Sequence, residues 1–248
     1  MTELEQNLLA IIQDAFPLEE RPYQVLAEQL GSDEQSVFAA VENLRRSGII
    51  RRIGGVYDSK ALGFISRLCA GKVPTATTGA ADDSALEKFA AVVNVIPAIT
   101  HNYVRSHEYN VWFTVMAQSE AEIQKIVDEV CANTELHDVH ILNATEKFKI
   151  NTVMKGAGAP VDSRQWSVDR NSVNPAGAIL ASKPYISHCY NRPPFEGFPY
   201  TLYAMMHAQS AEELDRQIKE AAESIGNPDY VVLRSVRELK KTSFKFFV

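Results

Sequence analysis

This chain of 248 residues has few cysteines, no long apolar run and no excess of positive charge. Its three cysteines, Cys69, Cys131 and Cys189, are scattered and form no CxxC pair, which indicates a reduced, cytoplasmic protein. No apolar run approaches bilayer length, and residues 1–5 lack the basic and apolar regions of a signal peptide. With a net charge of −6, no general basic field favours nucleic acid or a membrane surface.

What the chain does contain is an internal repeat. Residues 99–105 (ITHNYVR) return as residues 186–192 (ISHCYNR). Each copy carries a His, a Tyr and an Arg at every second position, so on a β-strand the three polar side chains share one face. Imidazole, phenol and guanidinium in a row suit an acidic substrate. The candidate site residues are therefore His101, Tyr103, Arg105, His188, Tyr190 and Arg192.

Residues 1–62 are predicted to form a winged helix-turn-helix. Apolar side chains recur at helical spacing over residues 4–15 and 23–30, and Ser32 begins a capping-box pattern that opens a third helix. Residues 49–57, with a Gly-Gly turn, are predicted to form a hairpin, the wing.

The charge of this segment argues against DNA as a partner. Residues 1–60 hold six basic and ten acidic side chains, a net charge of −4. Asp33 and Glu34 occupy the start of the third helix, where base and phosphate contacts usually lie. Arg51 and Arg52, beside the predicted wing, could instead contact a substrate, a phosphate or a neighbouring acidic side chain.

The rest of the chain is predicted to be α+β. Residues 63–154 follow the β-α-β-β-α-β order of a ferredoxin-like unit, with a last strand over residues 137–150. Residues 155–175 have the composition of a linker. Residues 176–248 then repeat the later part of the same pattern, with a closing strand over residues 230–239.

The second ferredoxin-like unit is predicted to be truncated. It has no helix-turn-helix, and its candidate for a first strand, residues 166–170, is weak. Such a unit would borrow an edge from a partner, or the chain is a fusion or an incomplete pair of subunits. We expect a homo- or hetero-oligomer assembled through the ferredoxin-like units.

A helix-turn-helix joined to a ferredoxin-like unit resembles the Lrp/AsnC regulators. Further motifs are more specific, and together they are similar to the siroheme decarboxylases of the alternative heme and heme d1 pathways. In the first unit these motifs are residues 51–58 (RRIGGVYD), 62–64 (LGF), 101–105 (HNYVR) and 109–113 (YNVWF). The second unit, with residues 187–193 (SHCYNRP) and 199–203 (PYTLY), resembles the other subunit type of that family. The resemblance covers residues 1–155 and 176–248.

The resemblance implies that siroheme loses CO2 from its C12 and C18 acetate groups, which gives 12,18-didecarboxysiroheme. Such a reaction needs an electron sink, supplied by protonating the macrocycle, and a second proton that completes each methyl group. His is the first choice of proton donor and Tyr the second. Arg binds carboxylates bidentately and keeps its charge. No cofactor beyond the tetrapyrrole, and no metal of the protein's own, is expected.

Other interpretations of the same residues stay open. His101 or His188 could be an axial ligand of the siroheme iron, or a packing residue. The two tyrosines could pack across the sheet, and the two arginines could be solvated edge residues. Four histidines without metal-ligand spacing are interpreted as structural: His107, His137, His140 and His207. Either repeat could hold the working site. A ligand-responsive Lrp/AsnC-type regulator and a non-catalytic heme-binding module are the alternative functions.

Overall fold

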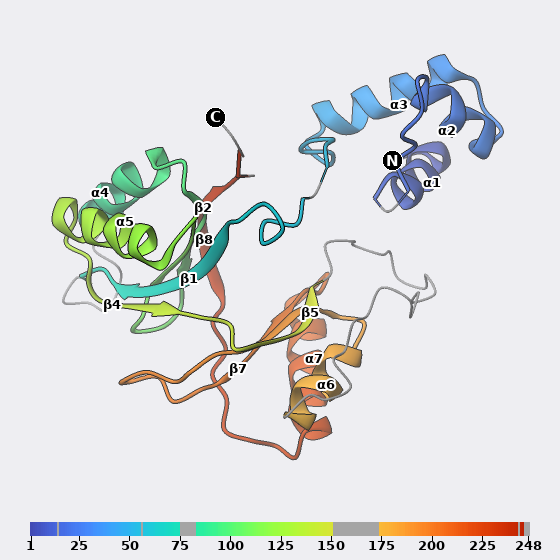
Figure 1. The fold of residues 1–248 in the computed structure, drawn as a ribbon. Coiled ribbons are helices and arrows are strands. Elements are labelled where there is room, and N and C mark those ends of the chain that lie inside the picture. The colour runs from blue at the N-terminus through green and yellow to red at the C-terminus, as the bar shows by residue number, and fades with distance from the viewer. Residues whose placement is uncertain (14, 56, 75–82, 151–173, 243, 246–248) are drawn as a thin grey trace. The chain divides into compact units, whose positions relative to one another are not determined.

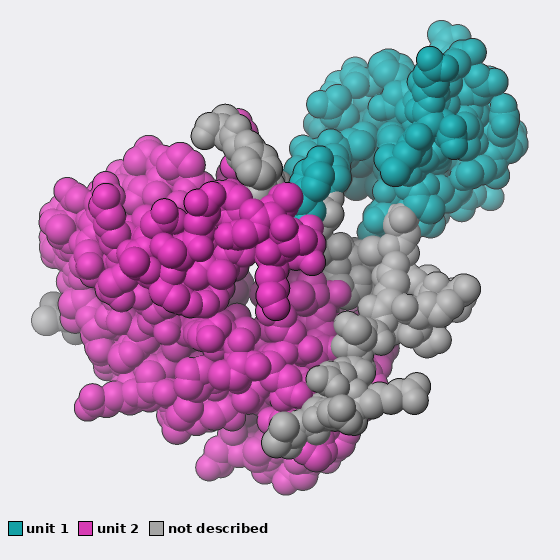
Figure 2. Space-filling model, in the orientation of Figure 1, with its two compact units in different colours: residues 1–57, 151–165 teal, residues 58–150, 166–248 magenta. Residues whose placement is uncertain are grey.

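The computed structural model describes residues 1–248 except residues 14, 56, 75–82, 151–173, 243 and 246–248. It divides into two compact units, whose described parts are residues 1–57 and residues 58–150 with 174–248 (Figure 2). Among the helices of these ranges, none combines the length and apolar character that crossing a lipid bilayer requires. The predicted linker and the weak strand candidate at residues 166–170 lie outside the described residues, except for the linker's last two positions.

Three helices form the first compact unit: α1 (Glu3–Ile12), α2 (Pro22–Leu30) and α3 (Glu34–Arg46). Their apolar faces meet in one core, whose buried members are Leu8, Leu26, Ala27, Val37, Val41, Leu44 and Ile50. Gly31 ends α2 with φ +61°, a left-handed conformation that favours glycine. The turn between α2 and α3 confirms the predicted helix-turn-helix.

The cap of α3 differs from the prediction by one residue. Asp33, and not Ser32, is the N-cap. Its carboxylate accepts hydrogen bonds from the Ser36 backbone N–H at 2.8 Å and from the Ser36 hydroxyl at 2.6 Å. An ionised carboxylate is a stronger acceptor than a serine hydroxyl at a helix start, which explains why the aspartate takes this position.

The predicted hairpin wing is wrong for the described residues between 49 and 57, because none of them forms a strand. Ile49 and Ile53 are 52% and 42% exposed, and of this segment Ile50 alone joins the helical core. A two-stranded hairpin is marginally stable by itself, and here it would have little apolar surface to cover.

Two antiparallel sheets make up the second compact unit (Figure 1). The first sheet has the strand order β4-β1-β3-β2-β8. Its strands are β1 (Ile65–Lys72), β2 (Ile99–Arg105), β3 (Val111–Ala117), β4 (His137–Leu142) and β8 (Ser235–Lys241). Helices α4 (Asp83–Val95) and α5 (Glu120–Asn133) pack on one face and bury Phe89 and Ile123 completely. The predicted ferredoxin-like order is confirmed in this part of the chain.

The second sheet is smaller and has the order β5-β6-β7. Its strands are β5 (Glu146–Ile150), β6 (Ile186–Asn191) and β7 (Leu202–Met206), with helices α6 (Pro175–Ser182) and α7 (Ala211–Ser224) on one face. Its β6 and β7 correspond to β2 and β3, while the described residues provide no counterpart of β1 or β4. The predicted truncation of the second unit depends on residues 166–170, which lie outside the described residues, so it stays a prediction.

The two sheets exchange their last strands, which the sequence analysis did not predict. Residues 137–150 form two strands instead of one, and β5 pairs with β6 of the second sheet. The predicted closing strand of the second unit, β8, pairs with β2 of the first sheet. Each crossing strand carries an apolar side chain into the other helical core, because Phe148 is buried against α6 and Leu239 packs on the first core. Burial of these side chains explains the exchange.

Candidate active site

The repeated residues form two rows of side chains, which we call ladders. The first ladder is His101, Tyr103 and Arg105, and the second ladder is His188, Tyr190 and Arg192. On β2, the ring centroids of His101 and Tyr103 are 6.3 Å apart, and the Arg105 guanidinium lies 4.8 Å from the Tyr103 ring centroid. The alternate side chains Asn102 and Val104 are buried on the helical side of the sheet. The structure thus places His101, Tyr103 and Arg105 on one face of β2, away from α4 and α5.

The second ladder repeats this arrangement on β6. The rings of His188 and Tyr190 are 6.1 Å apart, and Arg192 lies 5.1 Å from the Tyr190 ring centroid. Cys189 is fully buried on the opposite, helical side, where its Sγ lies 3.8 Å from the carbonyl oxygen of Gly177.

Both ladders lie on the faces that the two sheets turn toward each other. Trp112 of the first sheet contacts Tyr203 of the second, with ring centroids 6.3 Å apart, and both belong to one apolar cluster with Phe198. The positive charge of His101 also acts on His188, whose pKa is lowered first by burial and then by nearby cations that include His101.

A β-bulge precedes each ladder. The pairing register shifts between Ile99 and His101 and, in the same place of the repeat, between Ile186 and His188. Neighbouring side chains of a regular strand point to opposite faces, but the extra residue of a bulge changes this alternation. Thr100 Oγ1 consequently lies 2.9 Å from His101 Nδ1, and Ser187 Oγ lies 2.9 Å from His188 Nδ1. These contacts orient each imidazole with its Nε2 directed away from the hydroxyl.

The two ladder arginines have different surroundings. Arg192 is 9% exposed, and its Nη1 donates a hydrogen bond to the carbonyl oxygen of Leu142 at 2.6 Å, while its buried Nε has no partner among the described residues. Arg105 is more exposed and donates to Ser235 Oγ. Burial lowers the pKa of both side chains, although each retains its charge. Arg105 is thus the more accessible of the two guanidinium groups.

Arg51 and Arg52 belong to the other compact unit, where both are exposed. Arg51 lines a pocket of about 330 Å³ in that unit together with Glu42, Arg45 and Arg46. Because Arg51 and Arg52 lie in a different compact unit from the ladders, their role as substrate contacts stays a prediction. Within the described residues, no cluster of three or more His, Cys, Asp or Glu side chains could hold a metal ion.

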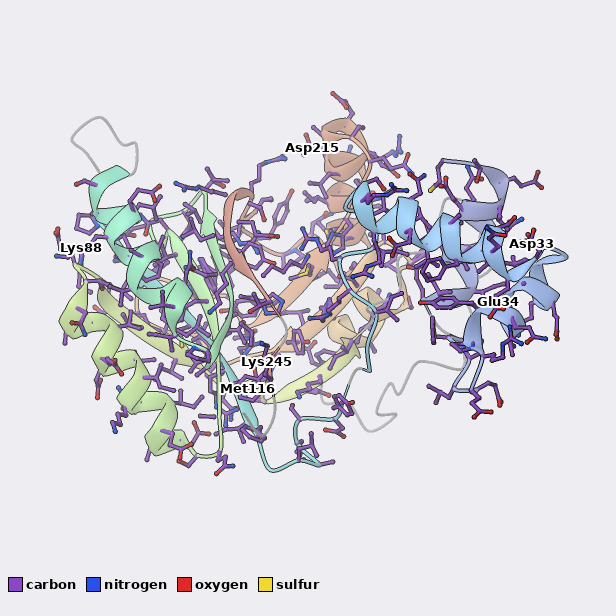
Figure 3. All side chains as sticks on the ribbon, turned by 90° about the horizontal axis from the view of Figure 1, so that it is seen from above. Asp33, Glu34, Lys88, Met116, Asp215 and Lys245 are labelled. Atoms are coloured by element: carbon purple, nitrogen blue, oxygen red, sulfur yellow. The ribbon has the colours of Figure 1, made fainter. Side chains whose placement is uncertain are left out.

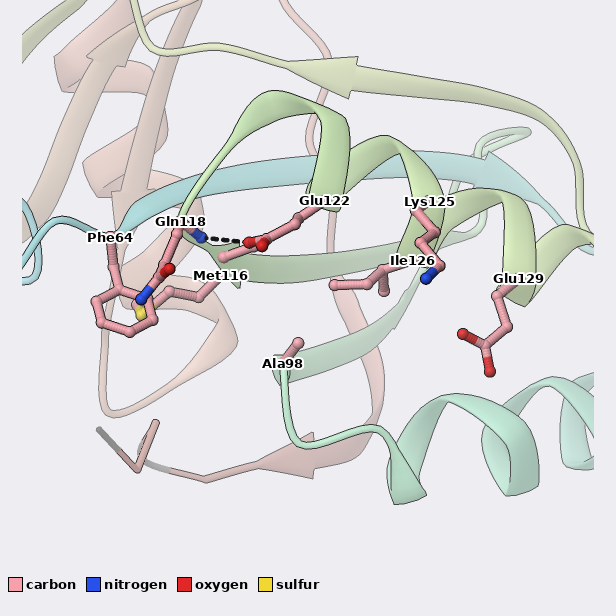
Figure 4. Close-up of a pocket in the computed structure, with 9 residues that line it drawn as sticks. Phe64, Ala98, Met116, Gln118, Glu122, Lys125, Ile126 and Glu129 are labelled. Carbon is pink, nitrogen blue, oxygen red and sulfur yellow. Dashed lines mark hydrogen bonds between the residues drawn. The ribbon is translucent and has the colours of Figure 1, made fainter. Parts of the chain in front are cut away.

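A larger pocket, of about 430 Å³, lies away from the ladders (Figure 4). It is lined by Met116 and by residues of α5, among them Glu122, Lys125 and Glu129. Two carboxylates against one ammonium give it the wrong charge for a substrate with many carboxylates. None of the predicted site residues lines this pocket.

Sequence reasoning missed the residues that support the ladders. Ser187 and Thr100 immediately precede the two histidines, and this hydroxyl-His pair in both copies was the available signal. His207, interpreted as structural, lies with its Nε2 3.0 Å from Ser187 Oγ. Tyr109 was also overlooked, although its hydroxyl lies within 3.2 Å of both Asp138 and His140.

Known proteins share this architecture. Residues 61–149 and 165–240 match the family model of the AsnC-like ligand binding domain, and residues 5–51 match the siroheme decarboxylase NirDL-like HTH domain. The siroheme decarboxylase alpha subunit of Desulfovibrio desulfuricans is 45% identical over 152 residues, which cover 60% of this chain and 82% of that protein. The siroheme decarboxylase of Hydrogenobacter thermophilus is 26% identical, over 97% of this chain and 94% of that protein.

The solved structures agree. A crystal structure of the siroheme decarboxylase NirDL in complex with an iron-uroporphyrin III analogue superposes with a TM-score of 0.67 at 26% identity, over 99% of this chain and 95% of that one. The fold and the paired ladders define a protein built from AsnC-like ligand-binding units. The chain belongs to the siroheme decarboxylases, a family of carboxy-lyases.

Proposed function

We propose that this chain removes CO2 from the acetate side chains at C12 and C18 of siroheme and releases 12,18-didecarboxysiroheme. The observation that carries the proposal is the pair of His-Tyr-Arg ladders on facing sheets, in a chain similar over nearly its full length to named siroheme decarboxylases. The iron-uroporphyrin analogue bound by a structural relative supports a tetrapyrrole as substrate.

The proposed chemistry uses the ladders as proton donors. When the bond between the acetate methylene and its carboxylate breaks, the electron pair enters the macrocycle, which must be protonated to accept it. A second proton, delivered to the methylene carbon, completes the methyl group, and the macrocycle then releases the first proton, so each loss of CO2 consumes one proton. His101 and His188 are the proposed general acids, because imidazole gives up a proton near neutral pH. Tyr103 and Tyr190 lie beside them as second donors.

Charge complementarity sets the proposed binding mode. Arg105 is the proposed carboxylate anchor of the first ladder. Arg192 is fixed by its hydrogen bond to the carbonyl oxygen of Leu142, and its Nε, without a partner among the described residues, is the proposed donor to a carboxylate at the second ladder. Catalysis is proposed to need no cofactor beyond the tetrapyrrole. Assembly into an oligomer through the ferredoxin-like units is part of the same proposal.

The direct test mixes the protein anaerobically with siroheme and follows the tetrapyrrole by mass spectrometry. We expect a product lighter by two CO2, and unchanged turnover after dialysis against a metal chelator. Double replacement of His101 and His188 by Gln should abolish turnover, whereas heat-denatured protein is the blank. An unchanged mass, in protein that visibly binds siroheme, contradicts the proposal and leaves a heme-binding module.

A regulatory role is less well supported by the helix-turn-helix. Asp33 and Glu34 stand at the amino-terminal end of α3 (Figure 3), where a DNA-reading helix would meet phosphates. Glu34 is paired with Arg21, which uses one of the unit's few cations. Salt-dependent binding of the protein to a promoter fragment at physiological ionic strength would favour this second function.

A further inference from the structure

The hydroxyl of Ser187 lies between two imidazoles. Its Oγ is 2.9 Å from Nδ1 of His188, on the ladder, and 3.0 Å from Nε2 of His207, which directly follows β7. A third and longer contact, of 3.3 Å, joins Oγ to the carbonyl oxygen of Met205. His188 is half-buried, whereas His207 is exposed. The three side chains therefore form a continuous path from solvent to the ladder.

Proton transfer along this path balances at every atom. A serine hydroxyl has one donor and two acceptor positions, so it can accept from one imidazole while it donates to the other. In one concerted shift, neutral His188 gives its Nε2 proton to the substrate while Ser187 passes its own proton to Nδ1 of His188. His188 is then neutral with its proton on Nδ1, and a turn of the imidazole ring presents this proton to the substrate for the next transfer. Ser187 then receives the Nε2 proton of His207, and solvent restores the proton of His207. No oxidant or further reactant is needed.

We infer that His207 and Ser187 form a proton relay that recharges His188 between decarboxylations, so that the second ladder is the one supplied directly from solvent. This inference rests on the proposed function and deepens it. Removal of two CO2 molecules consumes protons at the site repeatedly. A half-buried imidazole that could not regain its proton would act as an acid only once. His207 and Ser187 act through His188 and are positioning residues, not catalytic ones.

The first ladder lacks the outer half of this relay. Ile99 pairs with Val115 in the same way as Ile186 pairs with Met206, so Met116 occupies the place of His207. The backbone confirms this equivalence, because the amides of Met116 and His207 donate to the carbonyl oxygens of Ala98 and Tyr185 at the same point of each bulge. A thioether carries no proton at neutral pH, so the position equivalent to His207 offers Thr100 no second proton donor. The relay distinguishes two ladders that are otherwise alike.

The charges around the relay favour transfer toward the substrate. His188 is faced by His101 from β2 and by Lys149 from β5, and with His207 these cations and burial lower its pKa. The pKa of His207 is lowered first by the partial desolvation of its ring and then by Lys241 of β8. A lowered pKa favours the neutral form of His188, in which Nδ1 can accept the proton of Ser187.

Kinetics of four variants test the relay. His207→Ala should lower kcat on the order of 10²-fold with little change in KM, and added imidazole should restore turnover because the site is open to solvent. Ser187→Ala should show the same loss without rescue, while Ser187→Thr, which keeps a hydroxyl, should retain activity. Met116→Ala is the matched control at the equivalent position of the first sheet and should leave kcat unchanged. Wild-type kcat and pH profile in His207→Ala would overturn the relay.

A measurement without substrate separates this inference from the proposed function. Nuclear magnetic resonance titration of the histidine ring protons should show His188 and His207 titrating as a coupled pair, and the pKa of His188 should rise in His207→Ala. If the wild-type protein does not decarboxylate siroheme, the proposed function fails. If the His188 titration is the same in the wild type, Ser187→Ala and His207→Ala, the relay fails.

Discussion

Tyr109 shows how one side chain can hold distant segments in place. Its hydroxyl lies 3.0 Å from Asp138 and 3.2 Å from His140, and it donates a hydrogen bond to the carbonyl oxygen of Glu196 at 2.9 Å. The ring is 1% exposed and contacts Phe195, at 4.8 Å between centroids. Tyr109 thus fastens the loop between β6 and β7 to the first sheet. This loop follows Arg192, so the contact also fixes the end of the second ladder.

A pH-dependent contribution to stability follows from Asp138. Lys72 lies 2.8 Å from its carboxylate, and this hydrogen bond is the main cause that lowers the pKa of Asp138 to about 2. The unfolded value is about 4, so the interaction stabilises the fold above pH ~4 and is lost as the pH falls toward 2. We expect Asp138→Asn to lower the melting temperature at pH 7. The melting temperature of this variant should also fall less steeply than that of the wild type between pH ~4 and pH ~2.

Asparagine suits this test because Asp138 has φ +51°, a conformation that Asn also tolerates. The control is Asp215→Asn, which removes an exposed ion pair with Arg234 and should change the melting temperature little. If the melting temperatures of the wild type and Asp138→Asn, measured by circular dichroism, change in parallel with pH, this role for the carboxylate is ruled out.

At the scale of the elements, the sequence predicted helices and caps better than strand partners. Ser119 and Ser210 cap α5 and α7, and Val37, Val41 and Leu44, which recur at helical spacing, form the buried face of α3. The two ladders were predictable from a period of two. The pairing of β5 with β6 was not, because alternation shows which face of a strand is buried and not which neighbour it pairs with.

The contact of α6 with β5 gives a prediction at this scale. Gly177 lies against Phe148, and a Cβ at Gly177 would overlap the phenyl ring. Alanine favours a helix by up to about 1 kcal/mol, but overpacking a core costs about 1–3 kcal/mol. The overpacking cost is the larger, so Gly177→Ala should destabilise the protein by about 1–2 kcal/mol in urea unfolding.

Two further variants check that the overlap is the cause. Phe148→Leu in the Gly177→Ala background should recover part of the loss, since residues in contact do not contribute additively. Gly54→Ala, at a glycine with open space around it, should have an effect within about 0.5 kcal/mol. A loss of equal size in both glycine variants would point away from Phe148.

For the whole molecule, strand exchange makes each ferredoxin-like unit dependent on the other. The first sheet is completed by residues 235–241, and the second by residues 146–150. This dependence could not be predicted from the local pattern, because it arises from the choice between two similar sheet edges, those of β2 and β6. Leu239 and Phe148 settle the choice by the cores in which they are buried.

Cleavage of the chain between the two units tests this dependence. With a specific protease site introduced between residues 151 and 173, the two fragments should co-elute in gel filtration at micromolar concentration, since each contributes a strand to the other's sheet. The same digest in urea should show two separate fragments, which proves that cleavage is complete. Separate elution of the fragments in native buffer would contradict the exchange of strands.

The pairing of β2 with β8 also bears on how the protein is synthesised. His101 of β2 meets its partner Lys241 across 140 residues of chain, so the outer edge of β2 stays open on the ribosome until residues 235–241 have been translated. Such non-local pairing is slow to form, and an open strand edge is a site at which nascent chains aggregate. The edge that β8 covers belongs to the strand that carries the first ladder. Translation speed and chaperone supply should therefore influence the yield of active protein more strongly than its final stability does.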